Sequence, residues 1–149
     1  VRFGASASGE TLLESYMNTR EKFGTEPKRR TMLGNFVLSA EQAGTYFEKA
    51  LAMKAAITEE FSRAFESYDV LFSPTSPLLA WSLGGFNGDP LGLYAADICT
   101  VPANIAGIPG ISVPIGAVNG LPVGLQIMAD LYKEEVLFAV GKAIEEGRV

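Results

Sequence analysis

The stretch at residues 97–129, DICTVPANIAGIPGISVPIGAVNGLPVGLQIMA, decides the fold of this 149-residue chain. It carries no charged side chain between Asp97 and Asp130. Its length and apolarity fit a membrane span, but its four prolines and its glycines would leave too many backbone groups unpaired for one lipid-exposed helix. We therefore interpret it as the buried centre of a globular domain, with Asp97 as the only carboxylate at its entrance.

The order of turn residues in this stretch predicts a short helix followed by a hairpin. Pro102 is tolerated in the first turn of a helix that Thr100 or Val101 caps, and Gly107 ends that helix. Asn119-Gly120 is a strong two-residue hairpin signal between the predicted strands 111–115 and 122–128. Proline cannot donate to a strand ladder, so Pro114 and Pro122 are expected at an edge, a strand start or a bulge.

Hydrophobic periodicity outside this stretch predicts helices and one more strand. Helices are expected over residues 11–23, about 43–68, 91–98 and 133–146, with Leu12, Leu13 and Tyr16 facing a core. Residues 70–73 are expected to form a buried strand. The last helix is amphipathic and is expected to cover one face of the sheet. The predicted fold class is α/β, in a single domain of residues 1–149.

Composition excludes several classes of site. The chain has 12 Lys+Arg against 17 Asp+Glu, a net charge of −5, which disfavours direct binding of nucleic acid. With no His, the chain holds neither a Ser-His-Asp nor a Cys-His catalytic set, and no His metal site. The single Cys99 excludes an internal disulfide and is interpreted as a small apolar residue.

Two sets of charged residues are candidates for binding. Lys28, Arg29 and Arg30 near a helix start oppose the helix dipole, which favours a functional role for at least one of them; the alternative is a solvated basic turn. A guanidinium at Arg30 suits a carboxylate and a carboxylate at Asp97 suits an ammonium, so together they would recognise a free amino acid. The alternative is that Asp97 caps a helix and Arg30 makes a surface ion pair.

The loop after the predicted strand 70–73 offers hydroxyl groups. Ser73, Thr75 and Ser76 lie between or beside Pro74 and Pro77, where the chain must turn. Loops at strand ends often carry binding residues, so these hydroxyls are candidates for lining a pocket. Capping of a turn by Ser and Thr is the alternative interpretation.

Three segments resemble the amidase signature family: VPANIAGIPGISVPIG with NGLPVGLQ, KRRTMLGNFVLSA at residues 28–40, and DVLFSPTSP at residues 69–77. The resemblance is greatest to that family's branch of glutamine-hydrolysing A subunits of glutamyl-/aspartyl-tRNA amidotransferases. It covers nearly the whole chain but only the C-terminal portion of the family's chain, so the chain is expected to be an incomplete domain. It implies part of an α/β/α sandwich with a mixed β-sheet.

The resemblance also implies a function for the whole protein of which this chain would be part. Such proteins hydrolyse glutamine and pass ammonia to a B subunit, which uses ATP and Mg²⁺ to amidate Glu-tRNA(Gln) or Asp-tRNA(Asn) in a cytoplasmic complex with B and C subunits. Arg30 (Arg29 less so) and Asp97 match the residues that hold the α-carboxylate and α-amino groups of glutamine. The family's Ser-Ser-Lys machinery matches nothing here, so no catalytic residue, cofactor, metal or membrane contact is assigned, and the chain alone is expected to be inactive. The alternatives are another amide hydrolase of this family and a non-catalytic scaffold.

Overall fold

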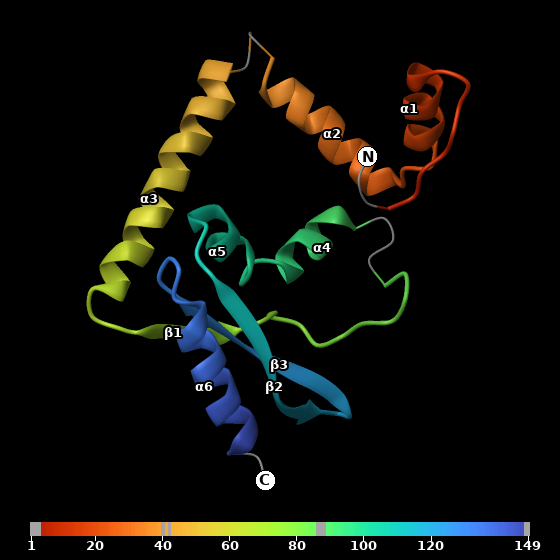
Figure 1. The fold of residues 1–149 in the computed structure, drawn as a ribbon. Coiled ribbons are helices and arrows are strands. Elements are labelled where there is room, and N and C mark those ends of the chain that lie inside the picture. Colours follow the sequence, from red (N-terminus) through yellow and green to blue (C-terminus); the bar gives the residue numbers. More distant parts are fainter. Residues whose placement is uncertain (1–3, 40, 42, 86–88, 148–149) are drawn as a thin grey trace. The chain divides into compact units, whose positions relative to one another are not determined.

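A computed structural model describes residues 4–39, 41, 43–85 and 89–147, and the chain divides into two compact units, Val1–Leu51 and Ala52–Val149. The first unit holds α1 (Leu12–Glu21), α2 (Thr25–Val37), the π-helical turn η1 (Ala43–Phe47) and the start of α3 (Glu48–Phe65). The second unit holds the rest of α3 and the elements β1 (Val70–Pro74), α4 (Pro90–Ala96), α5 (Val101–Ala106), β2 (Gly110–Val118), β3 (Leu121–Ala129) and α6 (Glu134–Glu146) (Figure 1). The sequence Ser39-x-x-Gln42 before η1 matches a helix capping box, and its residues 40 and 42 lie outside the described residues.

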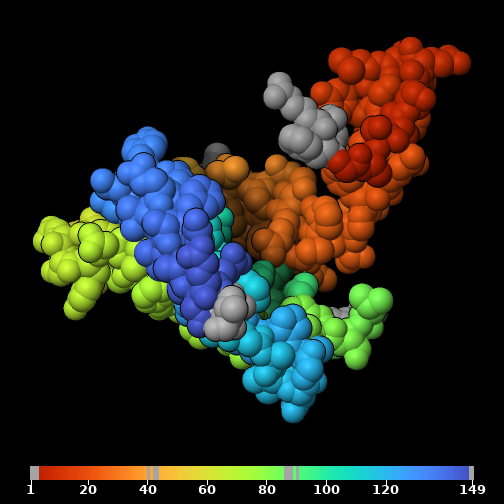
Figure 2. Space-filling model, turned by 60° about the horizontal axis from the view of Figure 1, so that its bottom comes forward, coloured from red at the N-terminus to blue at the C-terminus, as the bar shows by residue number. Residues whose placement is uncertain are grey.

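The second unit is built on a three-stranded antiparallel sheet in the order β1-β3-β2. β3 is the central strand; it pairs with β1 from Leu125 to Ala129 and with β2 from Leu121 to Met128. Residues 121–124 therefore pair only with β2, and this end of the hairpin stands clear of α6 (Figures 1 and 2).

The hairpin forms where the turn residues predict it. Asn119 and Gly120 have φ angles of 55° and 77°, the positive pair that a two-residue type I′ turn requires. Pro114 lies on the edge strand β2 beside a register shift between residues 114 and 116, and Pro122 is the second residue of β3. Both prolines thus occupy positions that need no ladder donor, as expected.

One face of the sheet packs on α6. Val113, Ile127, Ala129 and Leu137 form the buried cluster, and Leu137 is 1% exposed. Gly141 lets the helix approach closely, because a Cβ there would lie 2.8 Å from Ile111 Cδ1. The prediction that the last helix covers one face of the sheet is confirmed.

The opposite face of the sheet is polar at its centre. Gln126 is 6% exposed, and its side chain reaches Ser73 on β1 and the turn between α4 and α5. Residues of α5 and of β2 line one cavity on this face. The α/β class is confirmed, and the strand pairs among the described residues are all antiparallel. For β2 and β3 this is the arrangement that a two-residue hairpin turn allows.

Two predictions of burial were wrong. Leu12, Leu13 and Tyr16 on α1 are 75%, 71% and 42% exposed, so no described element covers this face of the helix. Phe72 is 54% exposed on β1, which is an edge strand. Periodicity shows which residues share a face, but it does not show that another element covers that face.

The uncharged stretch at residues 98–129 forms α5 and the hairpin, not one long helix. Within the described part of the chain, no helix combines the length and apolarity that a bilayer crossing demands.

Candidate functional site

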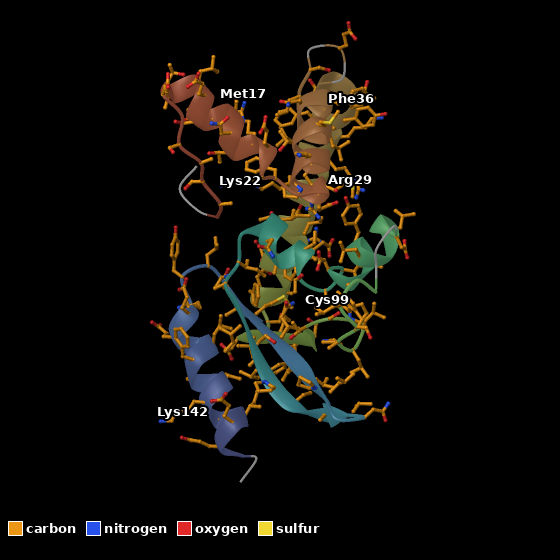
Figure 3. All side chains as sticks on the ribbon, turned by 90° about the vertical axis from the view of Figure 1, so that its right-hand side faces the viewer. Met17, Lys22, Arg29, Phe36, Cys99 and Lys142 are labelled. Carbon is orange, nitrogen blue, oxygen red and sulfur yellow. The ribbon has the colours of Figure 1, made fainter. Side chains whose placement is uncertain are left out.

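Asp97 lies at the end of α4, in the turn that leads into α5 (Figure 3, where Cys99 marks this turn). Its backbone carbonyl accepts hydrogen bonds from Thr100 N and Val101 N, both at 3.0 Å, and from Thr100 Oγ1 at 3.1 Å. Its side chain is exposed and has no hydrogen-bond or ion-pair partner among the described residues of 52–149. The backbone of Asp97 thus closes the turn, and its carboxylate does not cap α5.

Helix α5 has the predicted limits. Thr100 is its N-cap, Pro102 lies in its first turn, and Gly107 ends it with a φ of 76°. The Thr100 hydroxyl donates to Asp97 O and leaves the α5 amide groups without a side-chain cap. At six residues, α5 is too short to be stable alone, so its position depends on contacts with the sheet.

Arg29 and Arg30 lie on α2 and share one partner. Arg29 Nη1 lies 2.7 Å from Glu26 Oε2, and Arg30 Nε lies 2.8 Å from Glu26 Oε1. The Arg30 side chain is 61% exposed. Glu26 in the first turn of α2 offsets the unfavourable placement of cations near a helix start. The basic segment is therefore a solvated cluster in its own unit, and its binding role stays a prediction.

Arg30 belongs to the first compact unit and Asp97 to the second. Each is exposed within its unit, as a residue that contacts a ligand must be. The predicted joint recognition of an amino acid by the two side chains stays a prediction.

In the loop after β1, one hydroxyl group lines a cavity and another caps a turn, so each of the two interpretations applies to part of the loop. Thr75 Oγ1 lies 2.5 Å from Ser112 Oγ, and both residues line a cavity of about 550 Å³ with Pro74, Pro77 and Leu78. Ser76 Oγ accepts from Leu78 N at 3.3 Å, which is a turn cap, and it also donates to Ala96 O at 3.1 Å. Ser73 Oγ accepts from Gln126 Nε2 at 3.1 Å.

A second cavity, of about 350 Å³, lies between α5 and the polar face of the sheet. Thr75, Thr100, Asn104, Ser112 and Gln126 supply its polar lining. Asn104 Nδ2 donates to Thr100 O at 2.9 Å, which ties the side chain to its own helix. The second unit thus carries a polar, hydroxyl-rich surface next to the turn that holds Asp97.

Sequence reasoning missed three residues that shape these surfaces: Glu26, Ser112 and Gln126. Glu26 had a usable signal, since it precedes Arg29 and Arg30 by three and four residues on one helix. Ser112 and Gln126 are opposite each other in the ladder only because the register shifts by one residue between residues 114 and 116; a regular hairpin with a turn at Asn119-Gly120 would place Gln126 opposite Val113.

The described residues include no group of three or more His, Cys, Asp or Glu arranged to hold a metal ion. The free Cys99 is half-buried, and its backbone carbonyl oxygen accepts a hydrogen bond from Gln126 Nε2 at 2.8 Å.

The sequence model of the Amidase family matches residues 4–138. The A subunit of the glutamyl-tRNA(Gln) amidotransferase of Geobacillus sp. (strain WCH70) is 47% identical over 148 residues, which is 98% of this chain and 30% of the relative. The chain therefore spans about 30% of the length of this relative.

Solved structures agree with the sequence comparison. The crystal structure of the glutamyl-tRNA(Gln) amidotransferase A subunit from Thermotoga maritima matches with a TM-score of 0.68 and 41% identity, covering 90% of this chain and 30% of that one. A crystal structure described as an amidase matches with a TM-score of 0.67 and 23% identity, covering 92% of this chain and 31% of that one. The second match shows a shared fold only.

Proposed function

The chain belongs to the amidase signature family, and on that basis we propose that it is part of the glutamine-hydrolysing subunit of a tRNA-dependent amidotransferase. In this proposal the whole subunit releases ammonia from glutamine. Partner B and C subunits use that ammonia, with ATP and Mg²⁺ bound by the B subunit, to convert Glu-tRNA(Gln) or Asp-tRNA(Asn) to the amidated form. The complex acts in the cytoplasm, and tRNA is bound through the partner subunit.

The identity to amidotransferase A subunits carries this proposal. It is 47% for the Geobacillus relative over nearly the whole chain, whereas the solved amidase that shares the fold is 23% identical. The acidic composition of the chain, with a net charge of −5, agrees with tRNA binding by a partner and not by this chain.

Within the proposal, Arg30 binds the α-carboxylate of glutamine and Asp97 binds its α-ammonium group. The support is chemical: a guanidinium matches a carboxylate with two parallel hydrogen bonds, and an unpaired carboxylate favours a cation. The exposed Asp97 side chain has no partner among the described residues of its own unit, which leaves it available to a ligand. The catalytic nucleophile and base belong to the part of the subunit that this chain does not include.

The test is glutamine hydrolysis by a full-length subunit that carries these residues, assembled with its partners. We expect Arg30→Ala and Asp97→Ala each to raise the glutamine KM at least about tenfold, because each removes a charge-assisted hydrogen bond worth about 1.5–3 kcal/mol. Arg29→Ala is the matched control, since Arg29 shares Glu26 with Arg30 but is not assigned to the ligand.

Three outcomes are informative. Unchanged glutamine kinetics in both the Arg30 and Asp97 variants would refute the assignment of these residues. A large effect of Arg29→Ala with none of Arg30→Ala would move the carboxylate contact to Arg29. Hydrolysis of simple amides but not of glutamine by the wild-type subunit would favour another amide hydrolase of this family.

A further inference from the structure

The turn that carries Asp97 is anchored on both sides of that residue, by the loop after β1 on one side and by the strand β3 on the other. Asp97 follows the seven-residue helix α4 and precedes the six-residue helix α5. Isolated helices this short are not stable in water, so neither helix can fix the direction of the Asp97 side chain by itself. The position of the carboxylate must therefore be set by contacts from other elements.

Two side chains supply those contacts. Before Asp97, Ser76 Oγ donates to Ala96 O at 3.1 Å from the loop after β1. After Asp97, Gln126 Nε2 donates to Cys99 O at 2.8 Å from the central strand β3. The two donors thus hold the backbone one residue before Asp97 and two residues after it.

Both anchors are themselves held in place. Gln126 is only 6% exposed, and its amide group also reaches Ser73 Oγ at 3.1 Å and Met128 Sδ at 3.4 Å. Ser76 Oγ accepts a hydrogen bond from Leu78 N, which fixes the direction in which its own proton points. Ala96 is 5% exposed, so its carbonyl lies in a well-packed region where the loss of the donor would be costly.

We infer that Gln126 and Ser76 are positioning residues for glutamine: they hold the 97–100 turn so that the Asp97 carboxylate meets the α-ammonium group of the substrate. This inference rests on the proposed function. Neither residue touches the substrate in it; both act through the backbone on either side of Asp97. A turn whose backbone is already held this way need not be ordered when the ligand binds, which favours affinity.

The readout is the ratio of kcat/KM for glutamine to kcat/KM for glutaramate, which is glutamine without its α-amino group. A general loss of folding lowers both values, whereas a displaced Asp97 lowers only the value for glutamine. The variants are made in the full-length subunit in complex with its partners. Gln126→Met keeps the side-chain volume and removes the donor, and Ser76→Ala removes one half-buried hydroxyl group.

We expect Gln126→Met and Ser76→Ala each to lower this ratio about tenfold, less than the roughly hundredfold that a 1 Å misplacement of reacting groups can cost. Ser76→Thr, which keeps the hydroxyl group, should restore the ratio. Ser62→Ala is the control, because it removes a hydroxyl group that donates to Thr58 O within α3 and contacts neither Gln126 nor the 97–100 turn. It should leave the ratio within twofold.

The cycle with Asp97 separates the inference from the proposed function. If Asp97→Asn lowers the ratio and Gln126→Met adds nothing in that background, the two residues act through one contact, as inferred. If Asp97→Asn lowers the ratio while Gln126→Met and Ser76→Ala do not, the inference is overturned and the proposed function stands. If Asp97→Asn leaves the ratio unchanged, the role of Asp97 fails and the inference fails with it. If the Gln126→Met variant does not fold, the comparison of Ser76→Ala with Ser76→Thr tests the inference.

Discussion

At the scale of single residues, Glu26 competes with the proposed ligand for Arg30. The contacts at 2.7 and 2.8 Å are short, but both arginine side chains are 45% or more exposed. Exposed ion pairs contribute about 0.2–1 kcal/mol, which is too little to prevent exchange for a substrate carboxylate. The ion pair on α2 and the binding role of Arg30 are therefore compatible.

This competition predicts the effect of Glu26→Gln in the full-length subunit. We expect the glutamine KM to fall by at most about fivefold, since no more than about 1 kcal/mol of exposed pairing is removed. Steady-state kinetics measures this change in KM. Glu59→Gln is the control, because it removes a similar exposed i,i+4 pair with Arg63 and should leave KM unchanged. A rise in KM on Glu26→Gln would show that Glu26 orients Arg30 and does not compete.

Gly124 gives a second prediction at this scale. A Cβ at Gly124 would lie 2.7 Å from Thr75 Oγ1 and 2.8 Å from Ser112 Oγ, so Gly124→Ala must push apart the hydroxyl pair. We expect a loss of about 1–3 kcal/mol in the free energy of unfolding, the usual cost of overpacking. The midpoint of denaturant unfolding measures it.

The matched control for Gly124 is Gly34, which lies inside α2 with nothing within 4 Å of its virtual Cβ. Gly34→Ala should raise stability by up to about 1 kcal/mol, because alanine favours the helix. Equal effects of the two substitutions would contradict the crowding at Gly124.

At the scale of elements, the segments with strong local chemistry were predictable from the sequence. The limits of α5 follow from Pro102 and Gly107, and the hairpin follows from Asn119-Gly120, because these residues restrict the backbone on their own. The candidate Asp97 followed from its isolation beside an uncharged stretch. The exposure of Leu12 and Phe72 and the anchoring by Gln126 were not predictable, since each depends on which element lies opposite.

The hairpin turn gives a prediction at this scale. Gly120 has a φ of 77°, where a side chain costs about 1–2 kcal/mol, so Gly120→Ala should destabilise the hairpin by that amount. Asn119→Gly keeps a residue that tolerates positive φ and should change stability by less than about 0.5 kcal/mol. Hydrogen exchange of the amide groups of β2 and β3 measures both; faster exchange in the Asn119 variant alone would contradict the type I′ turn.

At the scale of the whole molecule, the described residues leave much apolar surface uncovered. Leu91, Ile98, Tyr132 and Phe138 are each at least 64% exposed, while the buried cluster under α6 holds four residues. The Geobacillus relative is about three times as long as this chain, which covers 30% of it. Surface of this kind usually marks an interface.

This exposure predicts how residues 1–149 behave when expressed alone. We expect them to bind the dye ANS strongly and to hydrolyse no glutamine above background, because the family's Ser-Ser-Lys machinery matches nothing in them. The full-length subunit should bind far less dye per molecule. If the isolated chain hydrolysed glutamine and kept that activity through further purification, this would contradict the proposal that the catalytic residues lie outside the chain.

The most direct test of the central claim is a crystal structure of the full-length subunit with bound glutamine. The account predicts that the Arg30 guanidinium lies about 3 Å from the α-carboxylate and that the Asp97 carboxylate lies about 3 Å from the α-ammonium group, the distances of charged hydrogen bonds. Glutamine bound with either of these side chains turned away from it, or Arg30 and Asp97 on opposite sides of the subunit, would contradict the account.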